Sequence, residues 1–142
     1  MRCDCGLFTL DCPAGWFDTT TDGMPFTLSM PDGVGALQFS VASYESGSPP
    51  KMDTAALESM IREFTEENSL GPLRDLVQEQ EELSLAAASF SLDEQTFGRV
   101  WYVSDGFNVA KVTYVCEQVQ PPLELLAAEQ IVRSLRFTAS DA

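Results

Sequence analysis

Hydrophobic and polar residues alternate along several short segments of this chain, and that alternation is the pattern of β-strands. Every second side chain of a strand lies on the same face of its sheet. In one such segment the even-numbered residues from Ala110 to Cys116 share one face, and the odd-numbered residues from Val109 to Val115 share the other. The sequence predicts six strands, at residues 7–12, 25–30, 35–44, 84–92, 97–103 and 107–116.

Two other segments have the spacing of amphipathic helices. The first, residues 53–68, begins at a capping residue, Asp53 or Thr54, and ends before Pro72. A second helix follows Pro121 and Pro122, because proline is tolerated in the first helical turn. The expected inward-facing residues are Leu57, Met60, Ile61 and Phe64 in the first helix and Ala128, Ile131, Val132 and Leu135 in the second.

Residues 73–83 fit two interpretations. Leu73, Leu76, Val77 and Leu83 suit a short helix. The alternating Gln and Glu residues over 78–82 suit an extended strand. We expect a helix or turn here, followed by a strand.

The order of these elements indicates the α+β class: a single-domain antiparallel or mixed β-sheet flanked by helices. A chain of 142 residues is long enough for one domain with its own core. We expect an N-terminal tail at 1–6, the domain at 7–137 and a C-terminal tail at 138–142. No apolar run approaches the roughly 18 residues of a membrane span, and the N-terminus lacks the apolar region of a signal peptide. We therefore expect a cytoplasmic protein.

Four landmarks of this order resemble a known superfamily. They are the opening strand that ends in Pro13-Ala14-Gly15-Trp16, the helix at 53–68, the hairpin that joins Trp101 to the segment 106–114, and the closing helix at 131–137 with its Ser-Leu end. They resemble the PsbP-like α/β/α sandwich superfamily, in particular its DcrB-like and bacterial immunity-type branch. The resemblance implies a sheet with helices on both faces and a binding or scaffolding role. It implies no catalytic residue.

The charge of the chain is strongly unbalanced. Eight Lys and Arg oppose 22 Asp and Glu, for a formal net charge of −14, and there is no histidine. Histidine is the usual general base and a common zinc ligand, so its absence argues against most familiar catalytic sites. An acidic protein is repelled by nucleic acid and anionic membranes. We therefore expect a basic protein partner, with no nucleic acid and no membrane.

Most of the negative charge lies between residues 53 and 94. Eleven acidic residues there oppose only Arg62 and Arg74, so the segment carries a net charge of −9. One interpretation is a face that keeps the protein soluble, and the other is a face that attracts a basic partner. The candidate binding residues are Glu58, Glu63, Glu66, Glu67, Glu79, Glu81 and Glu82.

Aromatic residues gather beside the predicted turn at Asp105 and Gly106. Trp101, Tyr102 and Phe107 are candidate binding residues, because Trp and Tyr are common at interface hot spots. Aromatic residues also favour strands, so the alternative is that this group belongs to the core.

The four cysteines, Cys3, Cys5, Cys12 and Cys116, predict no disulfide framework and no cofactor. The spacing of Cys3 and Cys5 is shorter than that of structural zinc ligands, so we expect no metal site. Cys12 and Cys116 are expected as reduced, buried, small hydrophobic residues.

These observations favour a non-enzymatic, acidic protein-binding domain, most concretely a bacterial immunity or adaptor protein for a basic partner, monomeric or homodimeric. A secretion-type chaperone is an alternative, which requires a homodimer and an exposed apolar groove. A hydrolase that uses carboxylates alone is a third, which requires two acids close together in a cleft.

Overall fold

The large sheet is antiparallel throughout. The computed structural model describes residues 2–4, 8–23, 25–31, 33, 35–43, 54–68, 70, 73–81, 83–93, 95–105, 108–117 and 124–137. All neighbouring strands of the seven-stranded sheet run in opposite directions. In spatial order the strands are β3 (Phe17–Asp18), β4 (Phe26–Ser29), β5 (Gly35–Ser43), β9 (Asn108–Cys116), β8 (Thr96–Ser104), β7 (Ser84–Asp93) and β6 (Arg74–Gln80).

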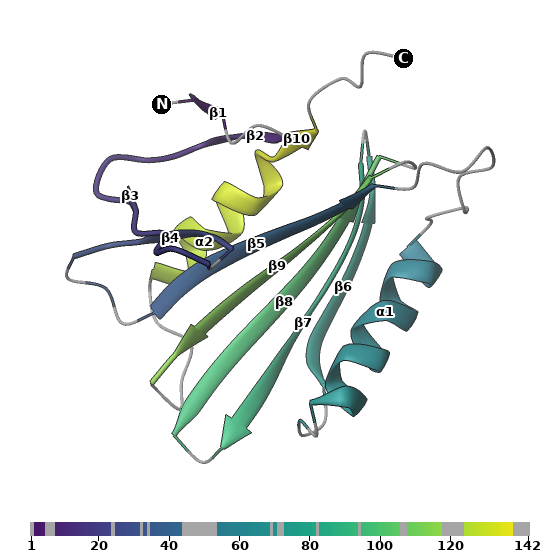
Figure 1. Ribbon diagram of the computed structural model, residues 1–142. Coiled ribbons are helices and arrows are strands. Elements are labelled where there is room, and N and C mark those ends of the chain that lie inside the picture. Colours follow the sequence, from purple (N-terminus) through teal and green to yellow (C-terminus); the bar gives the residue numbers. More distant parts are fainter. Residues whose placement is uncertain are drawn as a thin grey trace.

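Helices cover both faces of this sheet. Helix α1 (Thr54–Glu67) packs on one face, over β7, β8 and β6. Helix α2 (Glu124–Arg133) lies on the opposite face (Figure 1). Beside α2 is a small antiparallel sheet of β1 (Arg2–Asp4), β2 (Phe8–Asp11) and β10 (Arg136–Phe137). The predicted α+β class, a sheet flanked by helices in an α/β/α sandwich, is confirmed.

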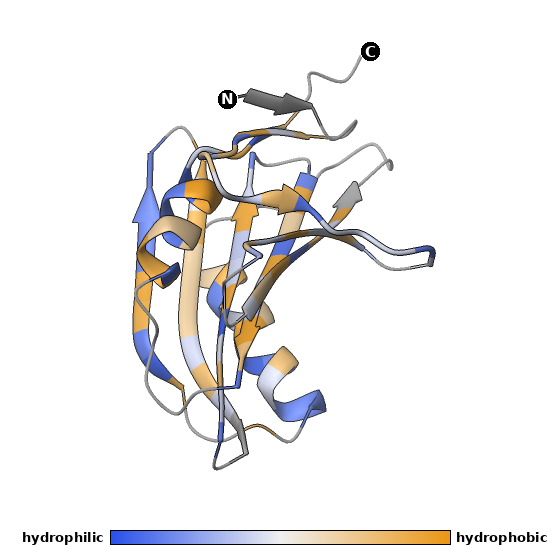
Figure 2. Ribbon diagram, turned by 90° about the vertical axis from the view of Figure 1, so that its left-hand side faces the viewer, coloured by the Kyte–Doolittle hydropathy of each residue, from blue (hydrophilic) through white to orange (hydrophobic). Residues whose placement is uncertain are grey.

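Each face of the sheet has its own core, because a strand buries alternate side chains on opposite sides. The helices that cover these cores alternate between polar and apolar residues along the chain, because each helix buries only one side (Figure 2). The larger core, on the α2 side, contains Phe8, Leu10, Trp16, Leu37, Trp101, Val112, Tyr114 and Ile131 among others. The core under α1 contains Leu57, Ile61, Ala86, Ala88, Phe90, Val100, Tyr102 and Val109. The predicted facing of β9 is confirmed.

The helix or turn that we expected at the start of residues 73–83 is wrong. Residues 74–80 form strand β6, which pairs with β7. A helix would have buried Leu76, but this side chain is 40% exposed. Pairing with the edge of an existing sheet overrides a weak helical pattern, because it satisfies the backbone groups of the segment.

The short strands β1, β3 and β10 were also missed. Residues 2–4 pair with β2, although they belong to the expected N-terminal tail. Arg136 and Phe137 pair with β2 from the other side, although they were expected to continue the closing helix. Strands of two or three residues are too short to produce a hydrophobic period. The N-cap candidate Asp53 lies outside the described residues.

The Pro-x-Gly-Trp landmark has a local conformational cause. The Trp16 amide donates to the Pro13 carbonyl at 3.2 Å, and Gly15 has a φ angle of 98°. A turn with positive φ at its third residue requires glycine in most sequences. This turn places Trp16, which is 5% exposed, in the larger core.

Among the described residues, neither helix has the length and apolar character that crossing a lipid bilayer requires. Cys12 and Cys116 are buried in the larger core, as the sequence predicted. Cys5, the second residue of the Cys3-x-Cys5 pair, lies outside the described residues.

A substitution at Gly98 would test the packing of the core under α1. Gly98 faces Phe90 across the β7–β8 pair, and a Cβ atom at this position would lie 2.4 Å from the Phe90 ring. We expect Gly98→Ala to lower the free energy of unfolding by about 1–3 kcal/mol, because overpacking forces the ring to move. Urea denaturation measures this loss. In the double variant, Phe90→Leu should restore part of the free energy of unfolding that Gly98→Ala removes. If the losses of the two single variants simply add in the double variant, the proposed clash is contradicted.

Candidate functional site

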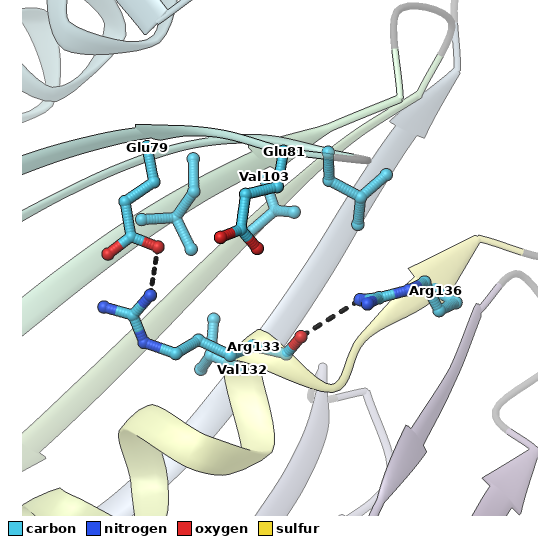
Figure 3. Close-up of a pocket in the computed structure, with 8 residues that line it drawn as sticks. Glu79, Glu81, Val103, Val132, Arg133 and Arg136 are labelled. Atoms are coloured by element: carbon cyan, nitrogen blue, oxygen red, sulfur yellow. Dashed lines mark hydrogen bonds and ion pairs between the residues drawn. The ribbon is translucent and has the colours of Figure 1, made fainter.

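A cavity of about 410 Å³ opens between the end of α2 and the sheet edge formed by β6. Its lining residues are Glu79, Glu81, Leu83, Leu85, Val103, Val132, Arg133 and Arg136. Glu79 and Glu81 point from the sheet toward the helix, and Arg133 reaches back from the helix toward Glu79 (Figure 3). The cavity therefore combines two acidic and two basic side chains.

The charged side chains of this cavity are held in place by defined contacts. Arg133 donates a hydrogen bond to Glu79, and its Nε lies 3.8 Å from Glu129 Oε2. The hydrogen bond to Glu79, followed by the neighbouring carboxylates, raises the pKa of Arg133. Arg136 Nη1 donates to the Arg133 carbonyl at 3.0 Å (Figure 3). It also donates to the Leu135 carbonyl at 2.7 Å. These bonds satisfy carbonyls at the end of α2.

The floor of the cavity is apolar. Leu85, Val103 and Val132 are buried side chains of β7, β8 and α2, and Leu83 is half-buried beside them. Val77 and Glu79 are two residues apart on β6, so both face α2. A group that enters this cavity would meet aliphatic carbon below and charges of both signs at the rim.

A buried polar network lies next to the cavity and fixes α2 to the sheet. Arg99 of β8 is 5% exposed and donates to Glu129 of α2 at 2.6 Å and to Ser89 at 2.8 Å. The indole Nε1 of Trp101 donates to the second carboxylate oxygen of Glu129 at 3.0 Å. The Arg99 guanidinium also lies 5.8 Å from the Trp101 ring centroid. One carboxylate thus binds two buried donors.

A bulge in β6 completes this network. Arg99 Nη1 donates to the backbone carbonyl of Asp75 at 3.2 Å. Asp75 has a φ angle of 51°, and the pairing register between β6 and β7 shifts between Arg74 and Val77. Aspartate tolerates this left-handed conformation better than most residues. The bulge therefore aims a third acceptor at the buried guanidinium, beside Glu129 and Ser89.

The second charged surface is the outer face of α1. Glu63, Glu66 and Glu67 are exposed there, and no described Lys or Arg lies within ion-pair distance of any of them. Glu58 differs, since it accepts from Gln78 at 3.1 Å and lies 3.6 Å from Arg62. We call Glu58, Glu63, Glu66 and Glu67 the α1 acidic face.

The structure separates the candidate acidic residues into two groups. Four lie on the α1 acidic face, while Glu79 and Glu81 line the cavity on the α2 side of the sheet. The candidate acidic residues therefore do not all share one face of the sheet. Glu79 lines the cavity on the α2 side with Val77 on the same strand face, whereas Gln78 between them contacts Glu58 of α1. Glu82 lies outside the described residues.

The candidate aromatic residues belong to the cores. Trp101 is 0% exposed in the α2-side core, and Tyr102 is 7% exposed beneath α1. The structure thus supports the alternative that these side chains pack inside the protein. Phe107 lies outside the described residues, and Asp105 closes the β8–β9 turn by accepting from the Asn108 amide at 2.8 Å.

Four residues of this region were not predicted from the sequence: Arg99, Glu129, Arg133 and Arg136. A signal for the first was present, since Arg99 stands among apolar residues within a predicted strand. A buried arginine needs an acidic partner. Glu129 and Arg133, four residues apart on the predicted last helix, share one helix face and were available for that role.

The network predicts a stability cost for the loss of Glu129. We expect Glu129→Leu to lower the free energy of unfolding by about 3 kcal/mol, because Arg99 would keep a buried charge without its carboxylate. Chemical denaturation measures this change. Adding Arg99→Met should restore part of the loss, and the exposed Glu117→Gln is the matched control. A loss no larger than that of Glu117→Gln would contradict this account.

Tyr102 predicts a dependence of stability on alkaline pH. Burial, and then the charges of Glu67 and Glu63, raise its pKa from 10.0 to about 12. The folded state therefore keeps a proton that the unfolded chain releases near pH 10, so stability falls as the pH rises from about 10 through about 12. We expect Tyr102→Phe to flatten this fall in denaturation curves. Glu67→Gln should lower the Tyr102 pKa in a spectrophotometric titration, whereas an unchanged pKa would exclude the contribution of Glu67.

Comparison with known proteins supports the fold alone. No protein-family model matches the sequence, and no curated protein matches it. The solved structures that are similar include the following two. A crystal structure from Bacteroides thetaiotaomicron VPI-5482 aligns with a TM-score of 0.63 at 14% identity. The alignment covers 96% of this chain and 47% of the Bacteroides chain, so this chain spans about half the length of the Bacteroides chain. The solution structure of cyanobacterial PsbP (CyanoP) from Synechocystis sp. PCC 6803 aligns with a TM-score of 0.64 at 8% identity, covering 97% of this chain and 92% of that one. The chain has a PsbP-like fold.

Proposed function

We propose that this chain is a non-enzymatic protein-binding domain that binds a basic partner through the α1 acidic face, as an immunity or adaptor protein does. The observation that carries the proposal is the group of exposed carboxylates on the second half of α1, at Glu63, Glu66 and Glu67. A basic surface that approaches them gains charge pairs and is steered over a distance of about one Debye length, roughly 8–10 Å.

The placement of these acids does not serve the stability of the helix. The last turn of α1 contains no basic residue, although the C-terminal end of a helix favours positive charge. Glu63 and Glu67 are four residues apart, and like charges at this spacing cost about 0.2–0.5 kcal/mol. Residues that break a local stability rule without a structural gain are expected at functional positions. The stability cost of placing these acids at the end of α1 supports a role in binding over a role in solubility alone.

The cavity beside α2 gives less support to the hydrolase alternative. Glu79 is engaged by Arg133, so one of its two acids already has an ion-pair partner inside the protein. The chaperone alternative requires a continuous apolar groove. The large apolar side chains that are exposed in the described part of the chain, Phe17, Leu76, Val115 and Leu126, lie on four different elements.

The proposal predicts that binding and stability respond oppositely to one variant. We expect Glu63→Gln/Glu67→Gln to raise the free energy of unfolding by about 0.5 kcal/mol, because a like-charge pair is removed. The same variant should capture much less of a basic protein from a lysate at about 50 mM salt, where charge pairs are weakly screened. The captured protein is identified by mass spectrometry and should also be depleted from the wild type at about 500 mM salt.

The matched control is Asp22→Asn/Glu117→Gln, which removes the same charge from two exposed positions outside α1. It should retain the partner, because the proposal depends on the position of the charge and not on its total. Equal loss in both variants would indicate non-specific attraction by net charge. Full retention in the α1 variant would overturn the proposed face.

A further inference from the structure

A second cavity, of about 280 Å³, lies on the α1 side of the sheet beside the end of α1. It forms because α1 packs over β7, β8 and β6, so its end stands beside the faces of β9 and β5. The lining residues are Pro25, Gln38, Ser40, Phe64, Asn68, Leu70, Phe90, Lys111, Thr113 and Val115. This cavity is separate from the one that contains Glu79 and Arg133, because the sheet lies between them.

The end of α1 builds one wall of this cavity. The Asn68 side chain donates to the Phe64 carbonyl at 2.8 Å, and the Leu70 amide donates to the Thr65 carbonyl at 2.9 Å. These bonds close the C-terminus of the helix and bring Leu70 back against the core. The Phe64 ring packs edge-on against Phe90, with ring centroids 5.6 Å apart. The apolar wall is therefore fixed in position before any ligand arrives.

The opposite wall is polar and contains a cation. Gln38 pairs with Thr113, and Ser40 pairs with Lys111, across β5 and β9, so these four side chains form one patch on the sheet. Lys111 is the only charged residue among the described residues that line the cavity. Its Nζ lies 4.1 Å from the Phe64 ring centroid, at the boundary between the two walls.

Lys111 is only partly solvated. Burial lowers its pKa, and the charge of Glu67 acts in the opposite direction. Its partners, an aromatic ring and a carboxylate that does not line the cavity, leave it without a close anionic contact among the described side chains. An ammonium group at the wall of an apolar cavity binds an anion more strongly than one in water, because fewer water molecules screen it.

We propose that this cavity binds a small carboxylic acid whose carboxylate meets Lys111 and whose apolar body lies against Phe64, Leu70 and Phe90. The hydroxyls of Ser40 and Thr113 and the amide of Gln38 supply further donors for the carboxylate. Inorganic phosphate matches the charge but would leave the apolar wall uncovered. At about 280 Å³ the cavity is just smaller than most ligand pockets, which span about 300–1,000 Å³, so it takes a single ring or a short chain.

The test uses phenylacetate and octanoate as probes, each against its uncharged amide, with the full chain followed by NMR spectra of backbone amides. We expect saturable shifts at Ser40, Leu70, Lys111 and Thr113 with at least one acid, and at least tenfold weaker binding of its amide. The better probe distinguishes an aromatic acid from a fatty acid. Failure of both acids to bind, or equal binding of acid and amide, would overturn the proposal.

Three variants separate the role of Lys111 from a general charge effect. Lys111→Gln should weaken binding at least tenfold, and Lys111→Arg should retain most of it. Arg62→Gln removes the same charge from an exposed position on α1 that does not line the cavity, and it should bind like the wild type. If Lys111→Gln does not fold, Thr113→Val tests the same wall without a change of charge and should weaken binding several-fold. Unchanged binding in the Lys111→Gln variant, or in Thr113→Val where that variant replaces it, would exclude this site.

Discussion

The buried guanidinium of Arg99 is the constraint on which the α2 side of this protein depends. A cation in a sheet interior is tolerated only where acceptors surround it, and three elements supply them: Glu129 from α2, Ser89 from β7 and the Asp75 carbonyl from β6. Because Glu129 also binds the Trp101 indole, the helix cannot rotate or slide without breaking two buried contacts. The apolar core gives α2 its affinity for the sheet, and this network fixes its orientation.

That orientation determines the shape of the neighbouring cavity. Arg133 lies one turn after Glu129 on the same helix face, so fixing Glu129 brings Arg133 within reach of Glu79. The chain then leaves the helix through Ser134, whose hydroxyl donates to the Ile131 carbonyl at 2.6 Å and accepts from the Asp11 amide at 2.8 Å. One side chain therefore ends α2 and connects it to β2, which gives the Ser-Leu landmark of the sequence a structural cause.

The regular elements were predictable because their signals are local. All six predicted strands begin within one residue of an observed strand, and those predicted from residues 35 and 84 begin at Gly35 and Ser84 themselves. For strand β6 the sequence offered an extended interpretation beside a helical one, and its own pattern could not decide between them, since its stability comes from pairing with β7. The candidate site was only partly predictable for the same reason. Glu79 and Glu66 look alike in sequence, but they lie on opposite sides of the sheet, and Arg99 acquires its role from Glu129, 30 residues later.

The sheet divides the charges of the protein as well as its cores. On the α2 side, carboxylates or backbone carbonyls bind the guanidinium groups of Arg99, Arg133 and Arg136. These charged groups therefore contribute to the internal structure. On the α1 side, Glu63, Glu66 and Glu67 lie at the helix end where the dipole is least favourable, and Lys111 lies a short distance away beside Phe64. Internal stability accounts for the first arrangement and not for the second. Among the described residues, the α1 side is therefore where we propose that charged side chains take part in binding.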